Sequence, residues 1–110
     1  MEINVKSIGQ VTVVEMAGDI DSNTAPQAQE RVLPLTQQAT KILLDMSGVE
    51  YMSSAGLRML LSMYRQMSRQ DGGIVLVGLS EEIKDTMAVT GFLNFFTTRD
   101  TVDEGLQALA

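Results

Sequence analysis

One stretch between two apolar segments decides the fold of this chain: Asp45-Met46-Ser47-Gly48-Val49-Glu50-Tyr51-Met52-Ser53-Ser54-Ala55-Gly56-Leu57. The apolar run at residues 42–44 precedes it without polar alternation, which is typical of a strand covered on both faces. Residues 57–69 follow it with apolar side chains at helical spacing. The two serines therefore lie at the mouth of a helix that follows a buried strand, where free backbone N–H groups favour an anion.

The composition predicts one globular domain that spans residues 1–110. Apolar residues make up 45% of the chain and charged residues 20%, as in soluble proteins. No apolar run approaches the roughly 20 residues of a membrane span, and the N-terminus does not have the pattern of a signal peptide. We therefore expect a cytoplasmic protein with no membrane insertion. The net charge of −6 argues against a nucleic-acid partner.

The chain contains neither cysteine nor histidine. It therefore cannot build a disulfide framework or a Cys/His zinc site, and it has no histidine for acid–base chemistry near neutral pH. A serine hydrolase is poorly supported, because the Gly-x-Ser-x-Gly motif is absent and no histidine can act as the base. We predict a protein that is not an enzyme and that needs no cofactor or metal.

The N-terminal part predicts a hairpin and a helix. Residues 3–16 have the β-propensity of two strands joined by a turn at Gly9. Thr24 begins a helix through a Thr-x-x-Gln capping box, with Pro26 in the first turn. Pro34 lies inside the helical pattern, so we expect a kink or an early break there. The apolar stripe of this helix consists of Ala28, Val32, Leu35 and Ala39.

The second helix has a clear apolar arc and a clear polar side. At 100° per residue, the arc that faces the core consists of Leu57, Leu60, Leu61, Tyr64 and Met67. The opposite side consists of Arg58, Ser62, Arg65 and Arg69. Met59 and Met63 fall at the edge of the arc. Together with Met52, they are either core residues or part of an adaptable protein-binding surface.

The C-terminal part continues the alternation of strands and helices. Residues 73–79 predict a second buried strand, and residues 93–98 a short edge strand. Ser80 caps a third helix that ends near Gly91, and Thr101 opens a capping box for the last helix. The packing residues of these two helices are Ile83, Met87, either Val89 or Thr90, Val102, Leu106 and Leu109.

The predicted order is β-β-α-β-α-β-α-β-α. Strands that alternate with helices form parallel pairs joined by right-handed crossovers, and the initial hairpin adds an antiparallel strand. We therefore predict an α/β fold with a mixed, mostly parallel sheet of four to five strands and four helices.

Three groups of residues could carry chemistry. Ser53 and Ser54 fit an N-cap, a phosphoacceptor or a ligand contact, and these roles are compatible. Asp19 and Asp21 fit solvated turn residues, a metal site or an acid–base pair. The loop that holds them lacks the Gly and the distal Glu of a calcium loop. The glycines near residues 72–78 match no nucleotide-binding motif.

Two of these stretches together resemble the STAS domain family of bacterial anti-sigma-factor antagonists. The first is the opening stretch at residues 45–57. The second is Ala17-Gly18-Asp19-Ile20-Asp21, which is followed by Thr24-Ala25-Pro26. The two motifs stand in the family's order, and the resemblance extends over essentially the whole chain.

The resemblance implies a partner-switching function. An unmodified antagonist of this family binds a serine kinase that also serves as the anti-sigma factor. Phosphorylation of the antagonist breaks that complex, and a PP2C-type phosphatase restores it. The phosphoacceptor corresponds to Ser54. The family's usual Asp before it is Ser53 here, which makes Ser53 an alternative acceptor, and Ala55 stands where Ser or Thr is frequent.

The same resemblance leaves an accessory-subunit role open, because related STAS proteins without phosphorylation serve in larger complexes such as lipid transporters. An enzyme that acts on a small molecule through its aspartates and serines is a further alternative. For the switch, we expect the two loops to form one partner-facing surface. Its predicted members are Asp19, Asp21, Thr24, Met52, Ser53, Ser54, Ala55, Gly56 and Leu57.

Overall fold

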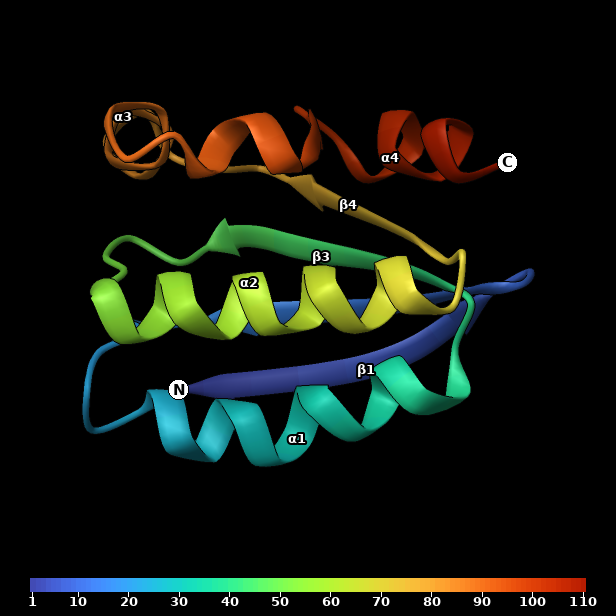
Figure 1. Cartoon of the computed structure of the whole chain (residues 1–110), viewed down its shortest axis with the longest axis horizontal. Helices are drawn as coiled ribbons and strands as arrows, with labels where there is room; N and C mark the ends of the chain where they lie inside the picture. The colour runs from blue at the N-terminus through green and yellow to red at the C-terminus, as the bar shows by residue number, and fades with distance from the viewer.

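Five strands and four α-helices alternate along the chain in the computed structural model, which describes residues 1–110 (Figure 1). The strands are β1 (Glu2–Ile8), β2 (Val11–Ala17), β3 (Lys41–Gly48), β4 (Gly73–Val77) and β5 (Thr97–Arg99). The helices are α1 (Ala25–Gln38), α2 (Ser54–Arg69), α3 (Glu81–Val89) and α4 (Val102–Leu109). The predicted α/β order is confirmed.

The strands form one sheet in the order β1-β2-β3-β4-β5. The hairpin pair β1–β2 is antiparallel, and the other three pairs are parallel. Because β2, β3 and β4 run in the same direction, their carboxyl ends meet at one edge of the sheet. The loops that follow these strands are thereby brought together, and this edge holds the candidate site.

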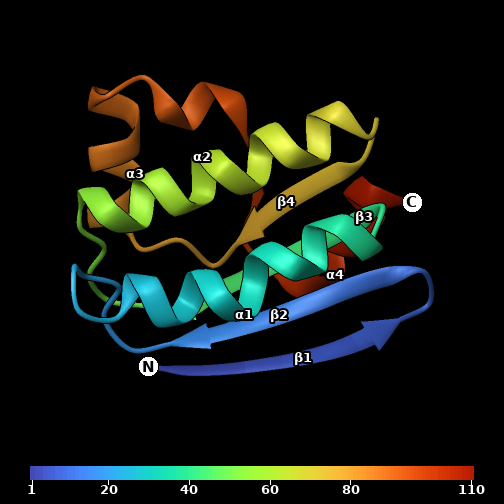
Figure 2. The same ribbon diagram turned by 60° about the horizontal axis from the view of Figure 1, so that its bottom comes forward.

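Helices cover both faces of the sheet. Figures 1 and 2 show α1 and α2 side by side along one face, where they contact each other. On the other face, α4 packs on β3 and β4 through a smaller cluster that includes Leu43, Val77 and Leu109. Covering on both faces explains why β3 and β4 are nearly continuous apolar runs. None of the helices is both long and apolar enough to span a bilayer.

Met52, Met59 and Met63 belong to the interior. Met59 and Met63 have no exposed surface, and Met52 is 7% exposed. All three are part of the larger apolar cluster beneath α1, α2 and α3. The core interpretation of these side chains is therefore confirmed.

Proline 34 does not end the first helix. α1 runs from Ala25 to Gln38 without interruption, so the expected early break is wrong. Proline has no backbone N–H, so Pro34 cannot donate to the Glu30 carbonyl. Both residues lie on the exposed side of α1, where that carbonyl can bind water instead.

The segment after Gly91 is a helical turn before it is a strand. Gly91 has a φ of 80° and ends the preceding helix, after which residues 92–95 form a 3₁₀ turn. Phe92, Leu93 and Phe96 are spaced i, i+1 and i+4, so a helical turn can direct all three toward the core. A strand would have separated them onto two faces. The predicted strand at 93–98 is therefore wrong over most of its length, and β5 covers only Thr97–Arg99.

The end of α3 also differs from its prediction. Ile83 and Met87 are buried, but Val89 is 88% exposed and Thr90 is exposed as well. Val89 lies about 240° around the helix from Ile83, on the solvent side. The residues of the 3₁₀ turn take the place in the core that Val89 or Thr90 was expected to fill.

Candidate partner-binding site

Backbone hydrogen bonds join the two predicted loops. Ile20 N–H donates to the Tyr51 carbonyl at 2.9 Å, and Ser53 N–H donates to the Ile20 carbonyl at 2.7 Å. A third bond runs from Gly18 N–H to the Gly48 carbonyl at 2.9 Å. Residues 18–24 after β2 and residues 49–53 after β3 thus form one continuous surface at the carboxyl edge of the sheet. The expected proximity of the two motifs is present in the fold.

Asp21 caps the turn that leads into the first helix, and Thr24 occupies the N-cap position of that helix. The Asp21 Oδ1 atom accepts hydrogen bonds from Asn23 N–H at 2.9 Å and from Thr24 N–H at 3.0 Å. Thr24 has a helical backbone conformation and makes no side-chain cap, so the predicted Thr-x-x-Gln capping box is wrong. Its hydroxyl instead accepts from Asp21 N–H and donates to the Asp19 carbonyl at 2.8 Å. Asp21 and Thr24 therefore fix the shape of the loop that carries Asp19.

These contacts change the acidity of Asp21. The N–H of Thr24, and next that of Asn23, hold the pKa of the Asp21 carboxyl below its usual value, because they stabilise the ionised form. The carboxylate therefore stabilises the folded state most fully above the ordinary aspartate pKa of about 3.9. This stabilisation is lost as the pH falls through the lower pKa of the folded state.

Replacing Asp21 by asparagine should remove this part of the pH dependence. We expect the free energy of unfolding of Asp21→Asn to be lower than that of the unmodified protein at neutral pH. The difference should become smaller as the pH falls below about 3.9, because the carboxylate of the unmodified protein is then protonated. Urea unfolding at a series of pH values measures both proteins. An offset that stays constant into the acid range would contradict the assigned role of the carboxylate.

The two serines have different positions at the start of α2. Ser53 is the N-cap, and its Oγ atom accepts a hydrogen bond from Ala55 N–H at 3.2 Å. Ser54 is the first helical residue; its side chain is exposed and makes no hydrogen bond within the protein. The Ser54 hydroxyl is thus free to react, whereas the Ser53 hydroxyl is engaged in holding the helix end.

Three of the residues expected at the partner-facing surface lie inside the protein. Met52 and Leu57 are 7% and 6% exposed, and Gly56 is buried. Their side-chain positions support the surface from beneath but do not line it. The members that reach solvent, which we call the rim, are Asp19, Asp21, Thr24, Ser53, Ser54 and Ala55.

A third loop contributes residues that the sequence motifs do not reveal. A groove of about 610 Å³ adjoins the rim. Its carboxylates come from the loop after β2, the loop after β3 and the first turn of α3, and it also contains Tyr51, which is 54% exposed. No three of these carboxylates converge in a way that could hold a metal ion. The predicted parallel topology implies this contribution, because the loop after β4 must reach the same edge of the sheet as the loops after β2 and β3. The lining residues are Asp19, Ser47, Val49, Glu50, Tyr51, Ser80, Glu81 and Glu82.

Comparison with known proteins gives one consistent family. Residues 2–105 match the sequence profile of the STAS domain. The anti-sigma-B factor antagonist of Bacillus subtilis (strain 168) is 27% identical over 107 residues, which cover 97% of this chain and 98% of that protein. The anti-sigma-B factor antagonist of Staphylococcus aureus (strain NCTC 8325 / PS 47) is 27% identical over 94 residues, covering 83% of this chain and 87% of that protein.

Solved structures give the same result. An anti-sigma factor antagonist from Mycobacterium paratuberculosis superposes with a TM-score of 0.89 and 26% identity, covering 98% of this chain and 92% of that chain. The similarity therefore includes the whole sheet, its helices and both loops of the candidate site.

Proposed function

This chain belongs to the STAS domain family, and we propose that it acts as an anti-sigma factor antagonist that is controlled through Ser54. The names of its relatives support the first part of this proposal. The observation that carries the second part is the exposed Ser54 hydroxyl, which is free of hydrogen bonds at the start of α2. In the proposed cycle, the unmodified chain binds an anti-sigma factor that is also a serine kinase, and the chain itself catalyses no reaction.

The proposed modification is a phosphoryl transfer from ATP to Ser54. A bond forms between Ser54 Oγ and the γ-phosphorus, while the bond between that phosphorus and its bridging oxygen breaks and ADP leaves. The hydroxyl proton passes to a base on the kinase. A PP2C-type phosphatase then hydrolyses the phosphoserine with water, which restores the hydroxyl and releases inorganic phosphate.

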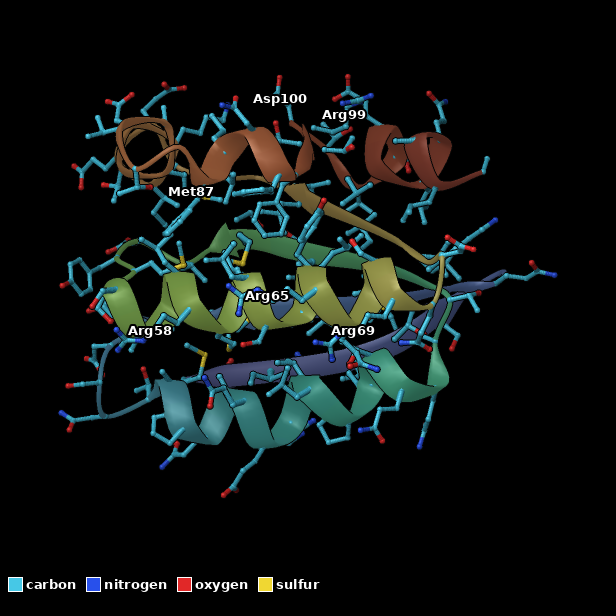
Figure 3. The ribbon with its side chains drawn as sticks, viewed as in Figure 1. Arg58, Arg65, Arg69, Met87, Arg99 and Asp100 are labelled. Atoms are coloured by element: carbon cyan, nitrogen blue, oxygen red, sulfur yellow. The ribbon has the colours of Figure 1, made fainter.

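The fold of this chain is suited to carry the phosphate. A phosphoserine has a charge of about −1.5 to −2, and the N-terminus of a helix favours such a charge. Arg58 lies four residues further along α2, on the spacing at which side chains of opposite charge interact, and Figure 3 shows it near the start of this helix. Phosphorylation therefore requires no rearrangement of the antagonist.

The same charge should disfavour the complex. The kinase must hold the γ-phosphate of its ATP next to Ser54 Oγ, so after transfer the phosphoserine faces the phosphates of ADP across the interface. Like charges in a partly desolvated contact can cost several kcal/mol. The acidic groove beside the rim adds carboxylates of the same sign. Release would then follow from local electrostatics.

Phosphorylation mapping tests this proposal. The unmodified protein, Ser54→Ala and Ser53→Ala are incubated with the cognate kinase and ATP, and tryptic peptides are analysed by mass spectrometry. We expect one phosphate on Ser54 in the unmodified protein and in Ser53→Ala, and none in Ser54→Ala. A phosphate on Ser53 alone would move the site by one residue, and no phosphate on either serine would contradict the switch.

A further inference from the structure

Helix α2 carries a line of arginines on its solvent side and no acidic residue. Arg58, Arg65 and Arg69 are spaced i, i+7 and i+11, so they fall within about 20° of a single line on the helix surface. The line is about 16 Å long. Figure 3 shows these residues along the length of α2. We call them the arginine stripe.

The arginines of the stripe are exposed and are not paired with carboxylates within the protein. Every ion pair in the structure uses a lysine, namely Lys6 or Lys84. Arg65 and Arg69 are four residues apart, a spacing at which like charges repel. The stripe therefore does not serve to stabilise the free protein.

The stripe makes one layer of an acidic protein positive. The neighbouring α1 contains one Glu and one Arg, which cancel, so the three arginines give the α1–α2 layer a formal charge of +3. The chain as a whole carries −6. The positive charge of the stripe thus lies on the face of the sheet that α1 and α2 cover. Negative charge lies elsewhere, including the acidic groove at the carboxyl edge of the sheet.

A groove of about 330 Å³ between α1 and α2 runs beside the stripe. Arginine offers only hydrogen-bond donors, and the amide and hydroxyl side chains here add further donors. The groove contains a single apolar residue, Leu33, which argues against an apolar helix or an acyl chain as its occupant. The remaining lining residues are Thr36, Gln37, Ser62, Arg65, Gln66 and Arg69.

We propose that the arginine stripe, which begins one turn after Ser54 at Arg58 and continues away from it to Arg69, is a docking surface for an acidic helix of a partner protein. When the two helices run antiparallel, carboxylates at positions i, i+4 and i+11 of the partner helix lie opposite Arg69, Arg65 and Arg58, respectively. Paired with carboxylates, the guanidinium groups gain charge-assisted, bidentate hydrogen bonds. The length and openness of the stripe fit an extended protein segment better than a small anion.

The other anionic partners fit this surface less well. Nucleic acid is a long, uniformly negative polymer that would extend beyond the stripe onto the rest of a chain with a net charge of −6, whereas a short acidic helix can contact the stripe alone. An anionic membrane surface usually requires exposed apolar or aromatic anchors beside the cations, and the groove has none that are aromatic. An acidic protein segment needs only the arginines and the amides.

Titration with a designed peptide tests the proposal in the intact chain. The peptide is helical, carries glutamates at i, i+4 and i+11, and is compared by NMR at low ionic strength with a scrambled peptide of the same composition. We expect the designed peptide to shift the amide signals of residues 58–69 and to bind more weakly as salt is added. The double variant Arg65→Glu/Arg69→Glu should lose at least tenfold in affinity.

A charge-matched variant provides the control. Lys6→Glu/Arg99→Glu changes the net charge equally, but Lys6 lies on β1 and Arg99 on β5, outside the α1–α2 layer that carries the stripe. It should retain affinity within about threefold. Equal losses in both double variants, equal binding of the scrambled peptide, or no shift in α2 would overturn the proposal. Saturable binding of inorganic phosphate alone in the groove, or stripe-dependent sedimentation with phosphatidylglycerol vesicles, would also replace it with a different ligand.

Discussion

Ser54→Glu is expected to weaken binding of the cognate anti-sigma kinase by at least about tenfold, which corresponds to about 1.4 kcal/mol. The glutamate places a negative charge at the first residue of α2, where the hydroxyl of Ser54 is exposed. The helix N-terminus tolerates this charge, so the variant should fold normally. The loss arises in the complex, where the charge meets the nucleotide phosphates and is partly removed from water.

Two variants separate this effect from general changes in charge or shape. Ser54→Ala removes the hydroxyl without adding charge and should bind the kinase with nearly unchanged affinity. Ser68→Glu adds the same charge at an exposed position near the other end of α2 and should also bind normally. Dissociation constants from calorimetry or surface plasmon resonance measure all three. Undiminished binding by Ser54→Glu would mean that charge at this residue does not control the complex.

Gly56→Val is expected to lower the free energy of unfolding by about 2–3 kcal/mol through overpacking. Gly56 lies where α2 crosses the joined loops, and a Cβ atom there would overlap Met52 Cγ and lie only 2.9 Å from Ile20 Cγ2. Ile20 and Met52 are paired across the two loops in a short parallel bridge. Displacing them would disturb the backbone hydrogen bonds that hold the rim, so kinase binding should fall together with stability.

Urea unfolding measures the change, and a position on the same helix provides the control. Ser68→Val adds a β-branched side chain at an exposed site of α2 and should change stability by no more than about 0.5 kcal/mol. Combining Gly56→Val with Met52→Ala removes the overlapping side chain. The double variant should therefore be more stable than the sum of the two single changes predicts. Strict additivity would show that the clash with Met52 is not the cause.

Sequence patterns predict the positions of the two serines and of Gly56 only in part. The order of apolar run, small residues and amphipathic helix places the serines at the start of a helix, and the structure has that arrangement. Which serine caps the helix could not be decided, because adjacent serines have the same capping preference. The motif predicts Gly56 on the partner-facing surface with its neighbours, but Gly56 is buried. Its burial depends on Ile20, which is distant in the sequence and in contact only after folding.

Thr24 and Val89 illustrate the same limit. Thr24 fits a capping box by spacing, but its hydroxyl is bonded to the Asp21 N–H and the Asp19 carbonyl, while Asp21 binds the N–H groups of the turn before the helix. Val89 continues the apolar pattern of α3, yet the chain reverses at Gly91 and brings Phe92 and Leu93 into the core. Local sequence propensity does not include these competing residues, since they come close to Thr24 and Val89 only in the folded protein.

The sequence by itself determined the order of strands and helices, the parallel topology and the two motifs, because apolar periodicity and helix capping act over a few neighbouring residues. The tertiary structure alone decided which residues of the motifs reach solvent, since burial depends on segments brought together across the sheet. It also decided that three loops share one acidic edge and that the arginines of α2 stand unpaired beside a polar groove. The free hydroxyl of Ser54 results from both: the motif provides the serine, and the cap formed by Ser53 leaves it exposed.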